Sequence, residues 1–133
     1  MEINFRHVAR VAAVMALYAV DVGKSDEKAA VAMACEELEL PRRWRRLTAR
    51  SVSDVLGKQD EIDKRIEKVA IGYTLDRMSA VDRALLRLGI FELVFGDLPK
   101  GVAIDEAVTI AKEFSTEDSG KFVNGILGKI ASE

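Results

Sequence analysis

The segment Ala80-Val81-Asp82-Arg83-Ala84-Leu85-Leu86-Arg87-Leu88 decides the fold class of this 133-residue chain. Apolar residues recur in it at intervals of three and four, and Ser79 precedes it, a residue type that caps helix N-termini. Because Asp82 follows Ser79 by three residues, the two resemble a capping box with the shorter acid. The segment therefore predicts an amphipathic helix whose core side includes Leu85 and Leu88.

Helical periodicity continues on both sides of this segment, and no stretch alternates long enough to predict a strand. Gly23, Gly57 and the loop Gly96–Gly101 mark expected helix ends. We expect Met33 on the buried face of the second helix and Tyr73 on that of the fourth. The sequence thus predicts an all-α protein of about seven helices, organised as one domain over residues 1–133. The other six helices are expected to begin near Phe5, Ser25, Pro41, Asp60, Val102 and Ser115.

Composition is that of an ordinary globular protein, with 49% apolar and 32% charged residues. The single cysteine, Cys35, excludes an intramolecular disulfide, and its place on an apolar helix face favours a buried small side chain. The first residues lack the basic-then-apolar layout of a signal peptide. The longest apolar run, Val11–Val20, is about half the length of a membrane span. We therefore expect a cytoplasmic protein that does not enter a membrane.

The sequence offers no arrangement typical of an active site. His7 is the only histidine, which excludes a site built on two histidines. The segment Gly125–Lys129 lacks the glycine spacing and the hydroxyl residue of a phosphate-binding loop. The acid pairs Glu36-Glu37 and Asp105-Glu106 are adjacent, so on a helix they point about 100° apart and do not converge. We expect no catalytic residue, no metal site and no cofactor.

The net charge of −2 argues against nucleic-acid binding unless positive charge is gathered locally. The segment Arg42–Arg50 contains five arginines and no acid. On a helix Arg43, Arg46 and Arg50 share one face, whereas Trp44 and Leu47 share another. This pattern is typical of an amphipathic helix with a solvated cationic side, and a direct contact with RNA stays an open alternative.

Four segments, taken in order, resemble the NusB family of transcription antitermination factors. They are the Ala80–Leu93 stretch, Pro99, the Val102–Val108 stretch and Lys121-Phe122-Val123-Asn124-Gly125. The resemblance implies two bundles of three or four helices packed into one globule, with the first helix at their junction. It also implies that the protein binds RNA and acts in transcription.

The resemblance implies RNA contacts at both ends of the chain. At the amino end, Arg6, His7 and Arg10 resemble the family's arginine-rich helix start, although Val8 interrupts the basic run. Because Arg6 and Arg10 lie four residues apart, both guanidinium groups share a face and suit successive phosphates. The alternative is that they are merely solvated.

At the carboxyl end, the resemblance implies that Asp118, Lys121 and Phe122 face RNA alongside the first helix. An aromatic ring beside a lysine suits unpaired bases, because stacking accepts any base while the ammonium holds the backbone. The alternative is that Phe122 is a core residue only. The expected ligand is a boxA-type single-stranded element of nascent ribosomal RNA.

The resemblance further implies a protein partner, NusE, a ribosomal small-subunit protein, within the RNA polymerase antitermination complex. Tyr18 and Asp82 lie where the family contacts NusE. Their alternatives are a half-buried core ring and a helix-capping acid. If three or four phosphates are neutralised, the salt slope is roughly −2 to −3, which predicts weak RNA binding without a partner. Whether the chain forms a homodimer is left open.

Two other functions fit the residues less well. One is a self-associating helical scaffold that does not distinguish boxA RNA from a scrambled sequence. The other is the NusB-like module found at the front of some ribosomal RNA cytosine methyltransferases. Since the sequence ends at Glu133, leaving no room for a cofactor-binding α/β domain, we expect the antitermination factor instead.

Overall fold

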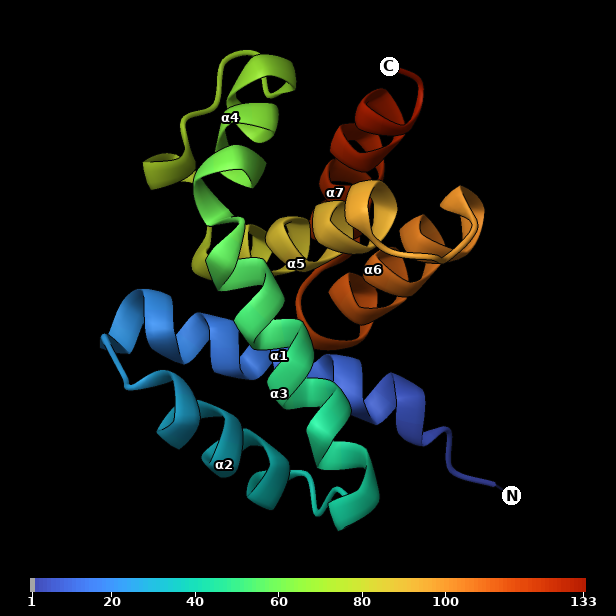
Figure 1. Cartoon of the computed structure of the whole chain (residues 1–133). Coiled ribbons are helices and arrows are strands. Elements are labelled where there is room, and N and C mark those ends of the chain that lie inside the picture. The colour runs from blue at the N-terminus through green and yellow to red at the C-terminus, as the bar shows by residue number, and fades with distance from the viewer. Residues whose placement is uncertain (1) are drawn as a thin grey trace. The chain divides into compact units, whose positions relative to one another are not determined.

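The computed structural model describes residues 2–133, and the chain is helical in every ordered element of that range, with no β-strand there (Figure 1). The all-α prediction is therefore confirmed. Backbone contacts divide the chain into two compact units, one ending at Gly57 and the other running from Lys58 to Glu133. None of the helices in the described range combines the length and apolar character needed to span a bilayer.

The first unit contains three helices, α1 (Phe5–Gly23), α2 (Glu27–Glu37) and α3 (Arg42–Gly57). α1 contacts both α2 and α3. Its buried face is rich in alanine, which lets the neighbouring backbones come close. The buried Thr48 hydroxyl of α3 donates a hydrogen bond of 2.9 Å to the Ala9 carbonyl of α1. This bond fixes α3 against the amino-terminal half of α1.

The second unit contains four α-helices, α4 (Gln59–Val69), α5 (Ala80–Ile90), α6 (Lys100–Phe114) and α7 (Glu117–Ala131). A single 3₁₀ turn, η1 (Leu75–Arg77), precedes α5, and a π-helical turn, η2 (Phe91–Phe95), follows it. α5 contacts α4, α6 and α7. It is the central helix of the unit, with every residue from Ala84 to Ile90 buried.

Two features fit α5 to its neighbours. The Arg87 guanidinium, only 8% exposed, donates to both carboxylate oxygens of Asp63 in α4, at 2.9 and 3.0 Å. Where α5 meets α7, a Cβ on Gly89 would lie 3.0 Å from the Leu127 side chain. Only a residue without a side chain fits there without displacing the leucine.

α1 ends at Gly23 as predicted, although the left-handed residue is the next one, Lys24, whose φ is +53°. Helix starts differ from the sequence prediction at three points. α6 begins at Lys100, inside the expected loop Gly96–Gly101. Asp26, and not Ser25, caps α2, accepting from the Ala29 amide at 3.2 Å. α4 begins at Gln59, so Asp60 lies in its first turn. Local sequence permits more than one capping residue, and the connection to the preceding helix selects among them.

Two residues expected in the core are exposed. Met33 of α2 is 73% exposed and Tyr73 is 54% exposed. Tyr73 lies outside α4, because that helix ends at Val69 and the chain turns through Gly72, whose φ is +84°. A positive φ favours glycine, so Gly72 was the signal that the fourth helix could not reach Tyr73.

Candidate nucleic-acid interface

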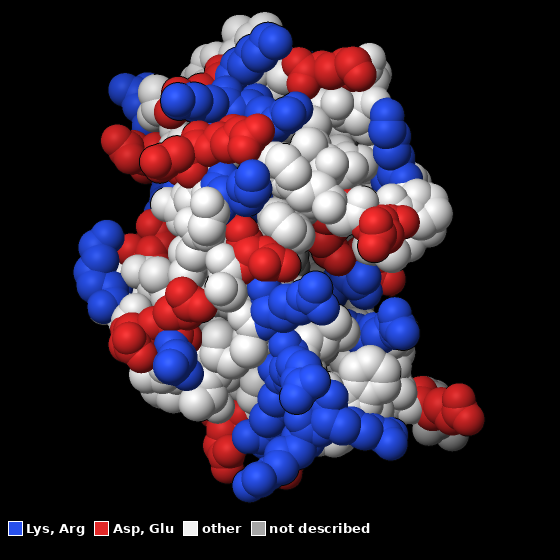
Figure 2. Space-filling view, in the orientation of Figure 1, with Lys and Arg blue, Asp and Glu red and all other residues white. Residues whose placement is uncertain are grey.

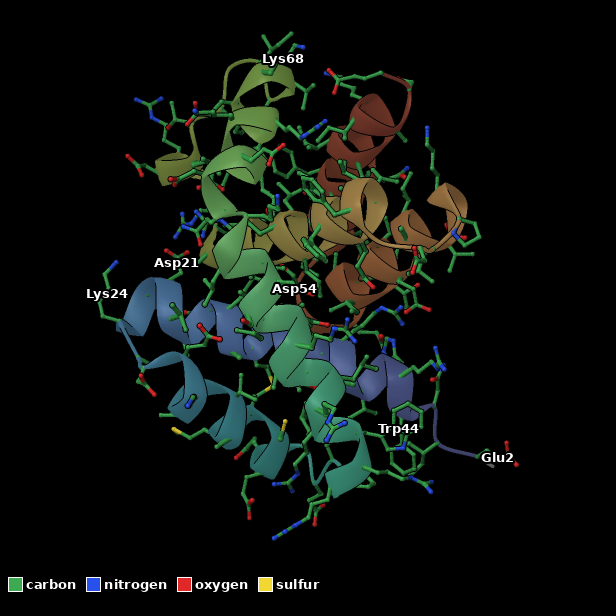
Figure 3. The ribbon with its side chains drawn as sticks, in the orientation of Figure 1. Glu2, Asp21, Lys24, Trp44, Asp54 and Lys68 are labelled. Atoms are coloured by element: carbon green, nitrogen blue, oxygen red, sulfur yellow. The ribbon has the colours of Figure 1, made fainter. Side chains whose placement is uncertain are left out.

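The start of α1 presents a cation held on an aromatic ring. Asn4 caps the helix by accepting from the His7 amide at 3.2 Å. The exposed Arg6 places its guanidinium carbon 6.0 Å from the centroid of the Trp44 ring of α3. The Phe5 ring lies 6.1 Å from the same indole, whose position beside the start of α1 is marked in Figure 3. A cation–π contact of this kind orients the arginine while leaving its charge accessible.

The other predicted residues of α1 differ in how far solvent reaches them. His7 and Arg10 are half-buried. Tyr18 is 41% exposed, so its side chain is accessible to a partner.

α3 carries the largest concentration of positive charge in the first unit. Figure 2 shows Lys and Arg side chains gathered over its amino-terminal half. Arg45 is the exception on this helix, because it turns inward and donates to the Leu40 carbonyl at 2.7 Å and to Glu36 at 3.3 Å. The exposed arginines are Arg42, Arg43, Arg46 and Arg50.

In the second unit, the amino-terminal ends of α5 and α7 border a pocket of about 440 Å³. Each of these helices is capped by its own hydroxyl residue. Ser79 accepts from the Asp82 amide at 3.1 Å, and Thr116 accepts from the Ser119 amide at 2.9 Å. The predicted cap at Ser79 is thus confirmed. Both helix starts, with their positive dipole ends, are directed to the same region.

Asp82 links the two helix ends. Its carboxylate Oδ1 accepts a hydrogen bond from the buried Ser119 hydroxyl of α7. Nearby, one guanidinium nitrogen of Arg83 donates to the carbonyls of Leu75 and Met78, at 2.9 and 2.8 Å. These bonds hold the turn before α5 and so define one wall of the pocket.

Two aromatic rings stand at this pocket. The Phe122 ring of α7 is half-buried and lies 5.1 Å from the Tyr73 ring, with an angle of 58° between the planes. Both residues line the pocket. Asp118 and Lys121, on the same helix, are exposed. The structure therefore brings Asp118, Lys121 and Phe122 together on an accessible surface, and Phe122 is not enclosed in the core.

Sequence reasoning missed several neighbours of these residues. Tyr73 was expected in the core, Trp44 was not connected to Arg6, and Ser119 was not singled out. Asn124, which follows Phe122 in the motif, is exposed because the buried face of α7 passes through Val123 and Ile126. Such contacts join residues far apart in sequence, and periodicity along one helix does not reveal them.

Cys35 is fully buried, which confirms its interpretation as a small apolar residue. Burial raises the pKa of its thiol, and the hydrogen bond to Thr48 and the charge of Arg45 oppose this shift. A thiol with a raised pKa is a poor nucleophile at neutral pH. Within residues 2–133, no three or more His, Cys, Asp or Glu side chains are grouped so as to bind a metal ion.

Comparison with known proteins identifies the family. A model described as the NusB family matches residues 7–132. The chain belongs to the NusB family. The resemblance drawn from Ala80–Leu93 and Lys121–Gly125 is thereby confirmed.

Curated members of the NusB family are similar to this chain over most of its length. The transcription antitermination protein NusB of Leifsonia xyli subsp. xyli is 48% identical over 130 residues, covering 95% of this chain and 90% of the relative. Among solved structures, NusB of T. maritima is 36% identical with a TM-score of 0.83, covering 100% of this chain and 94% of the other. A chain from a complex of the antitermination factors NusB and NusE with double-stranded RNA is 29% identical, with a TM-score of 0.88 and 98% coverage of both chains.

The match to the NusB family covers almost every residue singled out as a site. His7, Arg10, Asp118, Lys121 and Phe122 lie within the matched residues 7–132, and Arg6 lies one residue before them. Tyr18 and Asp82 also lie inside that range.

Proposed function

We propose that this chain is a non-catalytic, cytoplasmic transcription antitermination factor that binds boxA-type single-stranded RNA in nascent ribosomal RNA. It acts as one RNA-binding domain together with NusE and favours read-through by RNA polymerase. Membership of the NusB family supports the proposal, as does the structural similarity to a NusB bound to NusE and RNA. The RNA in that complex is double-stranded, so the preference for a single strand rests on another observation, the accessible Tyr73–Phe122 ring pair beside the exposed Lys121.

The ring pair favours an unpaired strand. Bases in a duplex are already stacked on one another, whereas a single strand can place a base against Phe122 or Tyr73. Lys121 supplies charge for the adjacent phosphate, and the Asp118 carboxylate can accept from an exocyclic amino group of a base. Both are exposed and lie within about one turn of Phe122 on α7.

The first unit contributes charge. Arg6, oriented by Trp44, binds a phosphate, and His7 and Arg10 extend the contact along α1. Tyr18 and Asp82 bind NusE. The Oδ1 atom of Asp82 is occupied by Ser119, so Oδ2 is the atom available to a partner's donor.

The test is a fluorescence-anisotropy titration of the whole chain with boxA RNA, with a scrambled strand and with the boxA duplex. Each titration is done with and without NusE and at two salt concentrations. Single-stranded boxA should bind best, and NusE should increase its affinity through linked binding. Equal affinity for boxA and scrambled RNA, or no effect of NusE, contradicts the proposal.

A pair of charge reversals sharpens this test. The double variant Arg6→Glu with Arg10→Glu should weaken RNA binding and lower the salt slope by about 0.7 for each phosphate that is no longer neutralised. The matched control is Lys64→Glu with Lys68→Glu, two exposed lysines also four residues apart, on α4. Equally weakened RNA binding in both double variants would show only the effect of net charge. Thermal unfolding of each variant checks that the fold is retained.

A further inference from the structure

A second hollow lies in the first unit, between α2 and α3. It is an open groove of about 740 Å³, lined from Glu27 to Cys35 on α2 and from Arg45 to Ser53 on α3. Each helix contributes residues at the same spacing over about two turns. At a rise of 1.5 Å per residue the groove is about 12 Å long.

The floor of this groove is apolar. Val31 and Cys35 are buried beneath it, and Ala32 and Ala49 are exposed at its surface, one on each helix. Because alanine is short, a partner's backbone can approach both helices closely. The floor between the two walls is formed by Val31, Ala32, Cys35 and Ala49, and Ser53 supplies the one hydroxyl among the described residues that line the groove.

The wall on the side of α3 is cationic. Arg46 and Arg50 line the groove, lie one helical turn apart and are exposed. Neither forms a hydrogen bond or ion pair with another residue of the described chain. Arg45, by contrast, is engaged by Glu36 and the Leu40 carbonyl. On the opposite wall Lys28 adds a positive charge, and Glu27 is the one acid among the described residues that line the groove.

We propose that this groove docks a short, acidic amphipathic helix of a partner protein. Apolar side chains of that helix, spaced three and four residues apart, cover Ala32 and Ala49. Two acids one turn apart pair with Arg46 and Arg50, whose spacing they match. An apolar floor with charge confined to its walls suits such a helix better than RNA, which needs polar contacts along the strand. None of the residues that line the groove is among those assigned to RNA or NusE.

The test uses the whole chain and a fluorescent synthetic peptide. The peptide carries leucines spaced three and four residues apart. It also carries two glutamates, four residues apart, on either side of the leucines. One control peptide replaces both glutamates by lysine, and another has the same composition in scrambled order. The acidic peptide should bind with a Kd of about 10–100 μM and shift the amide resonances of Val31, Ala32 and Ala49. The control peptides should bind at least tenfold more weakly.

Three variants locate the binding. Arg46→Glu with Arg50→Glu should weaken peptide binding about tenfold or more, as expected for reversing two exposed charges. Ala49→Gln, which fills the floor without changing charge, should weaken it as well. The matched control, Arg42→Glu with Arg43→Glu, reverses two charges of the same helix outside the groove and should leave binding unchanged. All three are surface changes, and thermal unfolding verifies the fold.

Several results would overturn the proposal. They include no binding of the acidic peptide at about 1 mM, equal binding of the lysine peptide, and equally weakened binding in the Arg42 and Arg43 control. If RNA shifts the same amide resonances and depends on Arg46 and Arg50, the groove is a nucleic-acid surface and a protein helix is the wrong occupant. Concentration-dependent self-association that requires the same two arginines would identify a second copy of the chain instead.

Discussion

Replacement of Phe122 by alanine separates stacking on RNA from packing within the fold. The ring is half-buried, and it packs against Tyr73, 5.1 Å away between centroids. Truncating a fully buried phenylalanine costs about 3–5 kcal/mol, and half-burial places the cost below that range. Native domains are stable by about 5–15 kcal/mol, so the variant should remain folded.

Although Phe122→Ala should stay folded, we expect it to lose much of its affinity for RNA. Stacking of a base on an aromatic side chain contributes about 1–3 kcal/mol, which corresponds to a decrease of about 5- to 150-fold in affinity for boxA RNA. Fluorescence anisotropy measures this decrease. Because the two rings touch, Tyr73→Ala and Phe122→Ala should not be additive in the double variant.

Two comparison variants decide how the result is interpreted. Phe122→Leu retains an apolar side chain of similar size but has no ring face. Its affinity for boxA RNA should therefore be reduced, as in Phe122→Ala. Phe91→Ala is the matched control, because Phe91 is also half-buried and packs on another ring, Phe95, at 5.6 Å. Full affinity in Phe122→Leu, or an equal decrease in Phe91→Ala, would refute stacking as the role of the Phe122 ring.

Three further predictions concern the contacts that hold each unit. Thr48→Val removes the buried hydrogen bond to the Ala9 carbonyl and should lower the free energy of unfolding by about 0.5–1.5 kcal/mol. An unchanged free energy in a urea titration would show that the bond contributes nothing. Asp63→Asn removes the carboxylate that pairs with the buried Arg87 guanidinium and should lower the free energy of unfolding by about 1.5–3 kcal/mol. Arg87→Met should lower it less, because Asp63 is the more exposed partner, and equal decreases in urea titrations would contradict this. Ser119→Ala should reduce the increase in boxA affinity that NusE produces more than it reduces RNA binding alone, and an unchanged NusE effect in anisotropy would count against the link.

Fold class was predictable because it depends on periodicity and capping signals that are local. The helix that begins at Ala80, its Ser79 cap and the limits of α1 all follow from such signals. The prediction for Tyr73 was wrong because the apolar period was extended past Gly72, where the backbone turns. Gly89, by contrast, lies inside α5, so a glycine within an apolar pattern ends a helix only where the backbone adopts a positive φ, as at Gly72.

The site was predictable only in part, and for a different reason. The resemblance pointed to Phe122, Lys121 and Asp118 as candidate site residues, and these are close along one helix. It did not identify Tyr73 or Trp44, because ring contacts across the fold depend on where separate helices cross. Arg45 shows the same limit, since its spacing resembles that of its exposed neighbours while its side chain bonds inward to Leu40 and Glu36.

The Asp82–Ser119 hydrogen bond gives the proposed NusE and RNA contacts a shared physical basis. Asp82 belongs to the first turn of α5, and Ser119 follows Asp118 in the first turn of α7. In the proposed function, a NusE donor on Asp82 would compete with the Ser119 hydroxyl for the carboxylate and would thereby act on the turn that carries Asp118. By linkage, RNA held at that turn must favour NusE at Asp82 to the same extent. The proposed function predicts such coupling for a chain with net charge −2, because three or four phosphate contacts would give only modest affinity for RNA.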